Sequence, residues 1–457
     1  MKELLALSLT GIVIMLADIF NARKLSFPIA LLGLATTLAS CILDWGVGED
    51  VYHMMKLDNF ALAFTSVLCV VGVMWLLMSV KYFDTMRDAT DRYALFFFIL
   101  TGALVMVSFT NLTMLFIGVE ILSISAYALA GSSKKDLASN ESALKYFLMG
   151  AFASGFLLLG IAFVYGAFGS FDLETIRGAK VTLANKSFLQ FGILGLIVGL
   201  GFKTAAAPFH FWAPDVYQGA PMPITALMAT VVKIAAIAAF YRLFVMCFVG
   251  SQSMWIDIVA ILLVLSLLVG NVTAVMQNDA KRMLAFSSIS HAGYLMFAIL
   301  CMGGSSEKGL LFYTLSYSIA TLVAFTVLFQ VSNATGSTSI SSFNGLGKTQ
   351  PVKAFFMSLA LLSMAGIPPL GGFMAKYFLF ANAISQGYVG LVVFAVVMSL
   401  VGIFYYFKIL MAMYGATDEA VEVQKQEYDP MQDIMLWFGS ALLLVLGLFP
   451  TFVYQLL

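Results

Sequence analysis

The chain has 457 residues, of which 61% are hydrophobic and only 11% are charged, and its formal net charge at pH 7 is zero. Soluble domains carry about a quarter charged residues, so a soluble fold would leave too much apolar surface in water, whereas a lipid bilayer accepts it. The neutral balance also gives no indication of a nucleic-acid partner. We therefore expect an integral membrane protein surrounded by the lipid bilayer.

Fourteen stretches of the sequence are apolar and long enough to cross the hydrocarbon core as helices, which needs about 20 residues. In chain order they cover residues 4–20, 27–45, 58–80, 93–109, 111–131, 143–169, 187–208, 222–249, 255–276, 283–302, 309–332, 352–386 (interrupted), 389–414 and 431–455. The first has the length of a signal peptide, but no small-residue cleavage pattern ends it, so we expect a retained span. The sequence thus predicts an all-α polytopic membrane protein in which residues 1–457 form a single integral membrane domain.

Two of these spans contain helix-breaking residues close to a deep lysine. Lys203 lies five residues before Pro208 in the seventh span, and Lys376 lies seven residues after Pro369 in the twelfth. Broken helices at membrane depth are tolerated where they line a hydrated cavity, and transporters place ion sites there. We therefore predict two discontinuous helices in an internal inverted repeat, with the two repeat units covering about 93–249 and about 255–414.

Basic residues in the loops indicate the orientation, because Lys and Arg are enriched in cytoplasmic loops. One set of loops holds twelve, namely Arg23, Lys24, Lys81, Arg87, Arg92, Lys134, Lys135, Lys281, Arg282, Lys348, Lys353 and Lys425. The other set holds six, namely Lys2, Lys56, Arg177, Lys180, Lys186 and Lys308. The richer side is expected to be cytoplasmic, so an even number of spans places both termini on the non-cytoplasmic side.

Charged residues inside the predicted spans are the first functional candidates, since a charge at the bilayer centre costs about 2.5–3.5 kcal/mol on insertion scales. Glu120 lies near the middle of the fifth span, and Ser123 and Tyr127 share its helical face. Burial disfavours a charged lysine and a nearby carboxylate favours it, so Lys203 is suited to load and release a proton near Glu120. A static structural ion pair is the alternative.

Lys233, His291 and Lys376 extend this group along the chain. Lys233 is expected to form a relay with Lys203; a lysine satisfied by backbone carbonyls is the alternative. Imidazole is suited to shuttling protons near pH 7, although a lone buried histidine is more often simply hydrogen-bonded. Lys376 is predicted to end the relay and to pass protons to one membrane face.

Some other polar residues have simpler interpretations. Lys145 follows Glu141 by four residues, which permits an ordinary helix pair, and Asp215 is interpreted as a turn or cap residue after Pro214. The four cysteines stand alone in apolar stretches and the three histidines are scattered, so no metal-ligand or redox-motif spacing is present. We expect no metal and no redox cofactor on this chain.

The residues around Lys203 resemble a known family. The run from Gly201-Phe202-Lys203 to Pro208-Phe209-His210-Phe211-Trp212-Ala213-Pro214-Asp215-Val216-Tyr217-Gln218-Gly219-Ala220-Pro221 is similar to the broken-helix motif of subunit N of bacterial respiratory complex I. Subunit N is the counterpart of NADH dehydrogenase subunit 2 and one of three antiporter-like subunits that also resemble Mrp-type cation/proton antiporters. The resemblance extends over essentially the whole chain, and Lys233 fits subunit N better than its two relatives.

The resemblance implies roles for the buried residues. Glu120 and Lys203 would be the pair on the fifth and seventh helices, Lys233 and Lys376 the onward carriers, and Lys145 a matching lysine on the sixth helix. The Ser-Ser-Ile-x-His-x-Gly-Tyr stretch that holds His291 matches the tenth helix of the family.

The implied function is proton translocation in the membrane arm of a complex-I-type NADH:quinone oxidoreductase of the bacterial cytoplasmic (inner) membrane. Its partners would be other membrane-arm subunits, including a neighbouring antiporter-like subunit. FMN, iron–sulfur clusters and quinone would be bound by partner subunits. A subunit of an Mrp-type cation/proton antiporter and a purely structural scaffold in the membrane arm are the alternatives.

Overall fold

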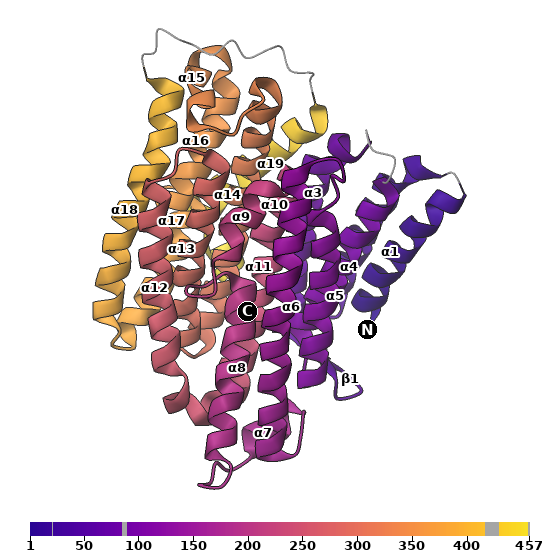
Figure 1. The fold of residues 1–457 in the computed structure, drawn as a ribbon, viewed down its shortest axis with the longest axis vertical. Helices are drawn as coiled ribbons and strands as arrows, with labels where there is room; N and C mark the ends of the chain where they lie inside the picture. The colour runs from indigo at the N-terminus through magenta and orange to yellow at the C-terminus, as the bar shows by residue number, and fades with distance from the viewer. Residues whose placement is uncertain (21, 85–88, 416–428, 456–457) are drawn as a thin grey trace.

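The computed structural model describes the whole chain except residues 21, 85–88, 416–428 and 456–457, and it is almost entirely helical (Figure 1). Among the described residues, 12 helices are long and apolar enough to cross a membrane. The other two predicted spans correspond to α1 and to the interrupted pair α16 and α17. The all-α polytopic prediction is therefore confirmed, with one short β-hairpin added to it.

The first half of the chain contains α1 (Lys2–Ile19), η1 (Arg23–Leu25), α2 (Ser26–Leu43), β1 (Glu49–Val51), β2 (Met55–Leu57), α3 (Asn59–Asp84), α4 (Ala89–Ser108), α5 (Leu112–Ala130), α6 (Leu137–Phe168), α7 (Leu173–Gly178), α8 (Lys186–Thr204), α9 (Trp212–Gly219), α10 (Met222–Leu227) and η2 (Met228–Val232). The second half contains α11 (Lys233–Tyr241), η3 (Arg242–Cys247), η4 (Phe248–Met254), α12 (Ile256–Val275), α13 (Ala280–Leu300), α14 (Gly304–Thr335), η5 (Ile340–Phe343), α15 (Leu346–Thr349), α16 (Pro351–Ala365), α17 (Gly371–Ser385), α18 (Val389–Tyr414), α19 (Pro430–Leu448) and α20 (Thr451–Tyr454).

The antiparallel hairpin β1–β2 lies at one side of the bundle together with α7, and we call this the hairpin side (Figure 1). Isolated bridges join Met55 to Phe109 and Asn111 to Asp172, which ties the hairpin to the segments that follow α4 and precede α7. Backbone pairing therefore orders the connections on this side. It also provides hydrogen-bond partners for backbone N–H and C=O groups of residues outside the helices.

Arg242 anchors the end of the eighth span to the same side. Its guanidinium Nη2 lies 2.7 Å from the Asp58 carboxylate, and its Nε donates to the backbone carbonyl of Phe109 at 2.9 Å. Because both the charge and the hydrogen-bonding groups are satisfied, Arg242 is buried without snorkelling to the aqueous phase.

Both predicted helix breaks are present. The seventh span ends as α8 at Thr204, and its second part resumes as α9 at Trp212. The twelfth span is divided into α16 and α17, with Gly366 at φ +86° directly after α16. Each break contains one cis X–Pro bond, Ala207–Pro208 in the first and Pro368–Pro369 in the second. The inverted-repeat relationship between the two halves stays a prediction.

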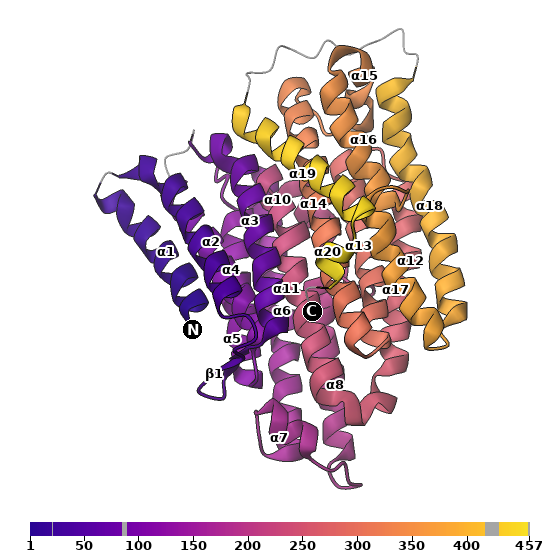
Figure 2. The same cartoon turned by 180° about the vertical axis from the view of Figure 1, so that it is seen from behind.

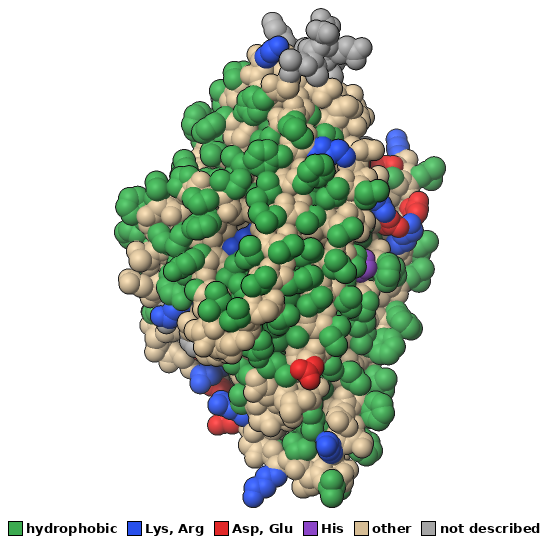
Figure 3. Space-filling model, turned by 90° about the vertical axis from the view of Figure 1, so that its left-hand side faces the viewer, with side chains coloured by type: hydrophobic (Ala, Val, Ile, Leu, Met, Phe, Trp, Pro, Cys, Tyr) green, Lys and Arg blue, Asp and Glu red, His purple; other side chains and the backbone are tan. Residues whose placement is uncertain are grey.

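Small residues allow the helices to approach closely, as is common in membrane bundles. Where α6 crosses α8, a side-chain carbon on Gly160 would lie only 2.7 Å from the backbone nitrogen of Leu196, so no larger residue fits there. The most apolar window of α13 is fully buried, whereas only 28% of the most apolar window of α18 is buried. Figure 3 shows hydrophobic side chains spread over most of one face of the molecule. Buried charges are thus exceptions in an apolar body.

Candidate functional site

Lys203 lies in the last turn of α8, immediately before the first break, and only 4% of it is exposed. Its ammonium nitrogen has no hydrogen-bond partner among the described residues. It faces aromatic rings instead, with the centroids of Tyr127 and Tyr146 each 5.2 Å away and that of Phe202 6.0 Å away. Cations are attracted to ring faces at such distances, so three rings form an aromatic cage around this charge.

A second layer of aromatic contacts holds the cage in place. Tyr146 stacks on Trp212 at a centroid distance of 4.6 Å, and Trp212 stacks on Phe202 at 5.1 Å. The indole nitrogen of Trp212 also donates to the backbone carbonyl of Phe202 at 3.0 Å. The first residue of α9 is therefore fixed against the end of α8, so the chain folds back across its own break.

Glu120 is partly buried on α5 and does not form an ion pair with Lys203 within the part of the chain that the structure describes. Its carboxylate accepts a hydrogen bond from the hydroxyl of Ser154 on α6. On the same face of α5, the hydroxyl of Ser123 donates to the carbonyl of Val119. The predicted ion pair between Glu120 and Lys203 is therefore not formed in this structure.

Lys233 begins α11 directly after the π-helical turn η2, and 2% of it is exposed. Its ammonium donates to the backbone carbonyl of Ser288 on α13. Tyr317 on α14 places its ring 5.9 Å from the same ammonium and donates its hydroxyl to the Ser288 hydroxyl at 3.0 Å. Single π-helical turns are frequent at functional sites because they shift side chains out of the regular helical register.

His291 joins three helices through hydroxyl groups. Its Nδ1 lies 2.7 Å from the Tyr313 hydroxyl on α14, and its Nε2 lies 3.2 Å from the Tyr406 hydroxyl on α18. The Tyr406 hydroxyl lies in turn 2.5 Å from the Ser287 hydroxyl. Both ring nitrogens therefore have partners that can donate or accept, which is what proton exchange through an imidazole requires.

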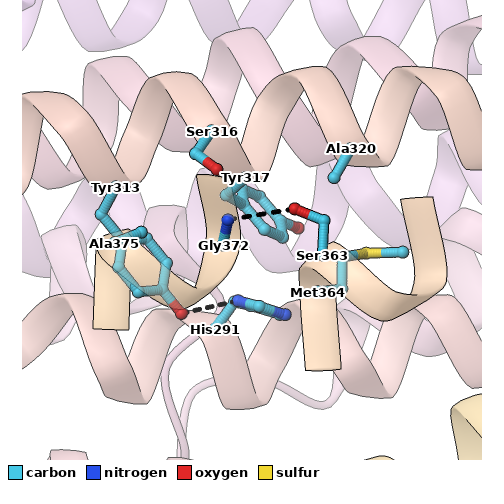
Figure 4. Close-up of a pocket in the computed structure, with 9 residues that line it drawn as sticks. All are labelled: His291, Tyr313, Ser316, Tyr317, Ala320, Ser363, Met364, Gly372 and Ala375. Atoms are coloured by element: carbon cyan, nitrogen blue, oxygen red, sulfur yellow. Dashed lines mark hydrogen bonds between the residues drawn. The ribbon is translucent and has the colours of Figure 1, made fainter. Parts of the chain in front are cut away.

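A small cavity beside His291 lies between α13, α14 and the second break (Figure 4). It has room for about one water molecule. Its lining includes Ser316, whose hydroxyl has no hydrogen-bond partner among the described residues, and Ser363, whose hydroxyl accepts from the Gly372 backbone N–H at 3.1 Å. An unsatisfied hydroxyl next to an imidazole is a suitable place for an ordered water.

Lys376 lies on α17 just beyond the second break, with 8% exposure. Its ammonium donates to the carbonyl of Ala365 at 2.9 Å and to the hydroxyl of Ser399 on α18 at 2.7 Å. The ring of Tyr294 lies 4.7 Å from the same nitrogen. Because Ala365 is the last residue of α16, its carbonyl has no partner in its own helix, so the break itself supplies the acceptor.

Lys145 lies apart from these buried groups, with 41% of its side chain exposed. It forms ion pairs with Glu141 at 2.7 Å and with Asp215 at 3.1 Å. Asp215 also pairs with Arg282 at 2.8 Å. Asp215 lies in the first turn of α9, as a residue near a helix start would, but it also connects α6, α9 and α13 through two basic partners, which the sequence did not indicate.

Comparison with known proteins identifies the family. The profile described as NADH:quinone oxidoreductase/Mrp antiporter, TM, matches residues 109–402. The chain is 41% identical to NADH-quinone oxidoreductase subunit N of Cytophaga hutchinsonii, over 100% of this chain and 99% of that protein. It is 42% identical to subunit N of Flavobacterium psychrophilum, over 100% of both. The chain belongs to the subunit N family. The resemblance found around Lys203 is thereby confirmed.

Solved structures agree with membership in the subunit N family. A chain in the structure of respiratory complex I from Thermus thermophilus with bound aureothin superimposes with a TM-score of 0.85 at 34% identity, covering 99% of this chain and 98% of that one. A chain of the Mrp complex from a Dietzia species gives a TM-score of 0.85 at 20% identity, covering 100% and 96%, which shows a shared fold only. The subunit N family forms antiporter-like, multi-pass subunits in the proton-translocating membrane arm of complex I.

Sequence reasoning did not find several residues that the subunit N structure brings to the site. Lys281, predicted in a loop, is a buried residue in the first turn of α13 and donates to the carbonyls of Gln218 at 3.0 Å and Ala220 at 2.5 Å. Tyr146 and Tyr406 are aromatic residues in apolar helices, where such residues normally indicate packing. Their contacts join segments far apart in the chain, so no local pattern marks them.

Proposed function

We propose that this subunit N carries protons through a relay of Glu120, Lys203, Lys233, His291 and Lys376, coupled to electron transfer in partner subunits that bind FMN, iron–sulfur clusters and quinone. One observation carries the proposal. Three lysines on three different helices are almost fully buried, and none forms an ion pair with an acidic group among the described residues. A buried cation without a counter-charge is costly, so each of these lysines is suited to exist in two protonation states.

The contacts along α13 support the second part of this path. Ser288, His291 and Tyr294 follow one another at intervals of three residues and therefore lie along one side of the helix. Ser288 accepts from Lys233, and the ring of Tyr294 faces Lys376. With His291 and its small cavity between them, α13 offers polar groups along the whole distance between the two lysines.

The short helix α9 supports the connection between the first and second parts. It packs against both α6 and α13. At its start Trp212 contacts the cage around Lys203, and the ring of Tyr217 meets that of Trp212 edge-on at 6.0 Å. A change in the charge of Lys203 thus acts on an element that also contacts the helix bearing His291.

The proposed relay also includes Lys145, which forms the end of the relay that is exposed. Its ion pair with Asp215 links the aqueous phase to α9 and through it to α6 and α13. Since Lys145 is accessible, it exchanges protons with water, whereas the buried lysines exchange them only with one another or with enclosed water.

The surroundings of the subunit are part of the proposal. The excess of basic loop residues supports a cytoplasmic-membrane orientation with both termini on the non-cytoplasmic side. The partly exposed carboxylate of Glu120 in the middle of α5 supports coverage of this face by another membrane-arm subunit. A neighbouring antiporter-like subunit, and two antiporter-like repeats at about 93–249 and about 255–414, belong to the same proposal.

The test is proton pumping by the assembled complex in proteoliposomes. Lys203→Ala and Lys376→Ala are each expected to remove most of the pumping while the complex still assembles. Lys408→Ala is the matched control, because Lys408 is a lysine at the end of a span that donates to Gln277 and Asn278 and lies outside the proposed path. Normal pumping by either alanine variant in fully assembled complex rules the relay out.

A further inference from the structure

A deep apolar groove lies between α2, α3, α14, α19 and α20, and its walls include none of the proposed relay residues. Figure 2 shows α2 and α3 on one side of this region and α19 and α20 on the other. The groove has a volume of about 780 Å³. Its walls are formed by residues such as Val67, Leu315, Leu442 and Phe452. Such an apolar surface in a membrane-spanning region favours contact with apolar groups over contact with water.

The polar ends of the groove lie toward the hairpin side. Trp45 lines it just after α2 ends, where the Gly46 backbone N–H donates to the Asn59 side chain at 2.9 Å. Gln455 lines it after α20. Tryptophan prefers the level of lipid headgroups because its ring is apolar and its indole N–H is polar. The mouth of the groove is thus lined by Trp45, a residue type that prefers the membrane interface, and the rest of the groove is lined mostly by apolar residues.

Lys308 extends the groove wall on α14 by one turn. It lies three and seven residues before Leu311 and Leu315, which line the groove, so all three share one helical stripe. Lys308 is partly buried and forms no salt bridge with the described residues. The neighbouring Glu307 lies within electrostatic range of both Lys308 and Arg242, so Lys308 is not its only cation. Lys308 therefore carries a positive charge one turn beyond the groove-lining part of α14.

The dimensions of the groove suit one acyl chain of a single leaflet. The stripe from Lys308 to Ile319 rises roughly 16 Å at 1.5 Å per residue, close to the thickness of one leaflet, about 15 Å. The volume of the groove is about 780 Å³. That volume lies within the range of about 300–1,000 Å³ typical of small-molecule sites.

We propose that the groove is a phospholipid site. One acyl chain of a glycerophospholipid from the hairpin-side leaflet lies against α3, α14 and α19, and its phosphate lies beside Lys308 with Trp45 at headgroup level. The acyl chain supplies the contacts that the apolar walls otherwise lack, and the ammonium supplies the opposite charge that a phosphate needs. The bound lipid contacts α2 and α3 on one side and α19 and α20 on the other, and it connects these helices without a covalent bond.

The experiment uses the whole purified complex reconstituted with phosphatidylglycerol, an anionic glycerophospholipid, that carries a diazirine in its acyl chain. After irradiation, labelled peptides are identified by mass spectrometry, and label is expected on the groove-lining parts of α3, α14 and α19. Leu315→Trp fills the groove and should remove most of this label. Lys308→Gln removes the cation, and about 1 kcal/mol per basic residue near a headgroup corresponds to a loss of roughly fivefold.

Two control variants test whether these losses are specific. Leu400→Trp adds the same side chain on the exposed face of α18, where Leu400 is 61% exposed, and Lys180→Gln removes an exposed lysine beyond α7. Both should keep the label on the groove. If Leu315→Trp does not assemble, Ala63→Leu fills the groove from α3 and should give the same loss.

Three results would overturn the proposal. Unchanged labelling in Leu315→Trp and Ala63→Leu means that the labelled lipid binds outside the groove. An unlabelled groove in wild-type complex, with cross-links from its walls to another subunit, means that a protein segment occupies it. Displacement of the label by an isoprenoid quinone, without any effect of Lys308→Gln, means that the occupant carries no phosphate.

Discussion

The lysines beside the two helix breaks are held in opposite ways. Lys203 precedes its break, has no hydrogen-bond partner among the described residues and faces three aromatic rings. Lys376 follows its break, donates to Ala365 and Ser399 and faces one ring. The same sequence signal, a breaker near a deep lysine, therefore produces one cation stabilised by rings and another stabilised by hydrogen bonds.

The side of the break on which each lysine lies explains this difference. At the first break the freed carbonyl of Phe202 is already used by the Trp212 indole, and that of Gly201 by the Ala206 backbone N–H. At the second break the carbonyl of Ala365 points to a lysine that comes later in the chain. A lysine after the break can reach back to the open helix end, whereas Lys203 belongs to the helix that ends.

The largest effect is expected from a variant that disrupts the second break, where Lys376 is held by hydrogen bonds. A side-chain carbon on Gly372 would clash with the Ser363 carbonyl, where α17 meets α16. Gly372→Ala should therefore force the two halves of the span apart, destabilise the subunit by about 1–3 kcal/mol and remove most pumping. The matched change is Gly390→Ala on α18, which meets nothing within 4 Å and should leave both properties normal. Pumping rate and complex yield are the measurements.

A smaller effect is expected when one acceptor of Lys376 is removed. Ser399→Ala takes away a hydrogen bond to a charged group, which is worth about 1.5–3 kcal/mol and corresponds to a loss of roughly tenfold or more in pumping rate. Ser358→Ala on α16 removes a hydroxyl whose hydrogen bonds among the described residues go to Ala354 and Tyr414, and it serves as the control. Equal pumping by the two serine variants would show that hydrogen bonding to Lys376 is unimportant.

The aromatic cage of Lys203 predicts a different pattern. Tyr146→Phe keeps the ring and removes a hydroxyl that has no partner among the described residues, so pumping should change little. Tyr146→Leu removes the ring, and the loss of about 1 kcal/mol of cation–π attraction should lower the pumping rate roughly fivefold. Comparable losses in both variants would mean that the hydroxyl, and not the ring, supports Lys203.

The smallest effect is expected at the exposed end of the path. Lys145→Gln breaks ion pairs with Glu141 and Asp215 in which every side chain is at least 40% exposed. Exposed pairs contribute about 0–1 kcal/mol, so pumping at low ionic strength should fall by at most roughly fivefold and converge with wild type at high salt. A loss as large as that of Lys203→Ala would place Lys145 in the obligatory path.

Hydropathy and helix breakers predicted most of the fold. The fourteen predicted stretches correspond to helices of the bundle, and both interruptions lie where Pro208 and Pro369 indicated them. This succeeded because a bilayer requires about 20 apolar residues per span and because proline cannot continue a helix, and both are local properties. The hairpin β1–β2 was not predicted, since its strands have only three residues each.

The surroundings of the buried charges were not predictable in the same way. Lys281, assigned to the loop between the predicted spans 255–276 and 283–302, is buried because the carbonyls at the end of α9 lie beside it. Glu120 was paired with Lys203 by their opposite signs, yet the carboxylate binds Ser154. Each of these contacts depends on how helices distant in sequence rotate and cross.

By itself the sequence determined that this protein is a helical membrane protein of the subunit N family, that two spans are broken and that lysines lie within them. What each lysine touches follows from the way several helices pack together. Insertion into a bilayer depends on the composition of single segments. The environment of a buried charge depends on side chains from several helices, and here rings and carbonyls, not carboxylates, surround the lysines.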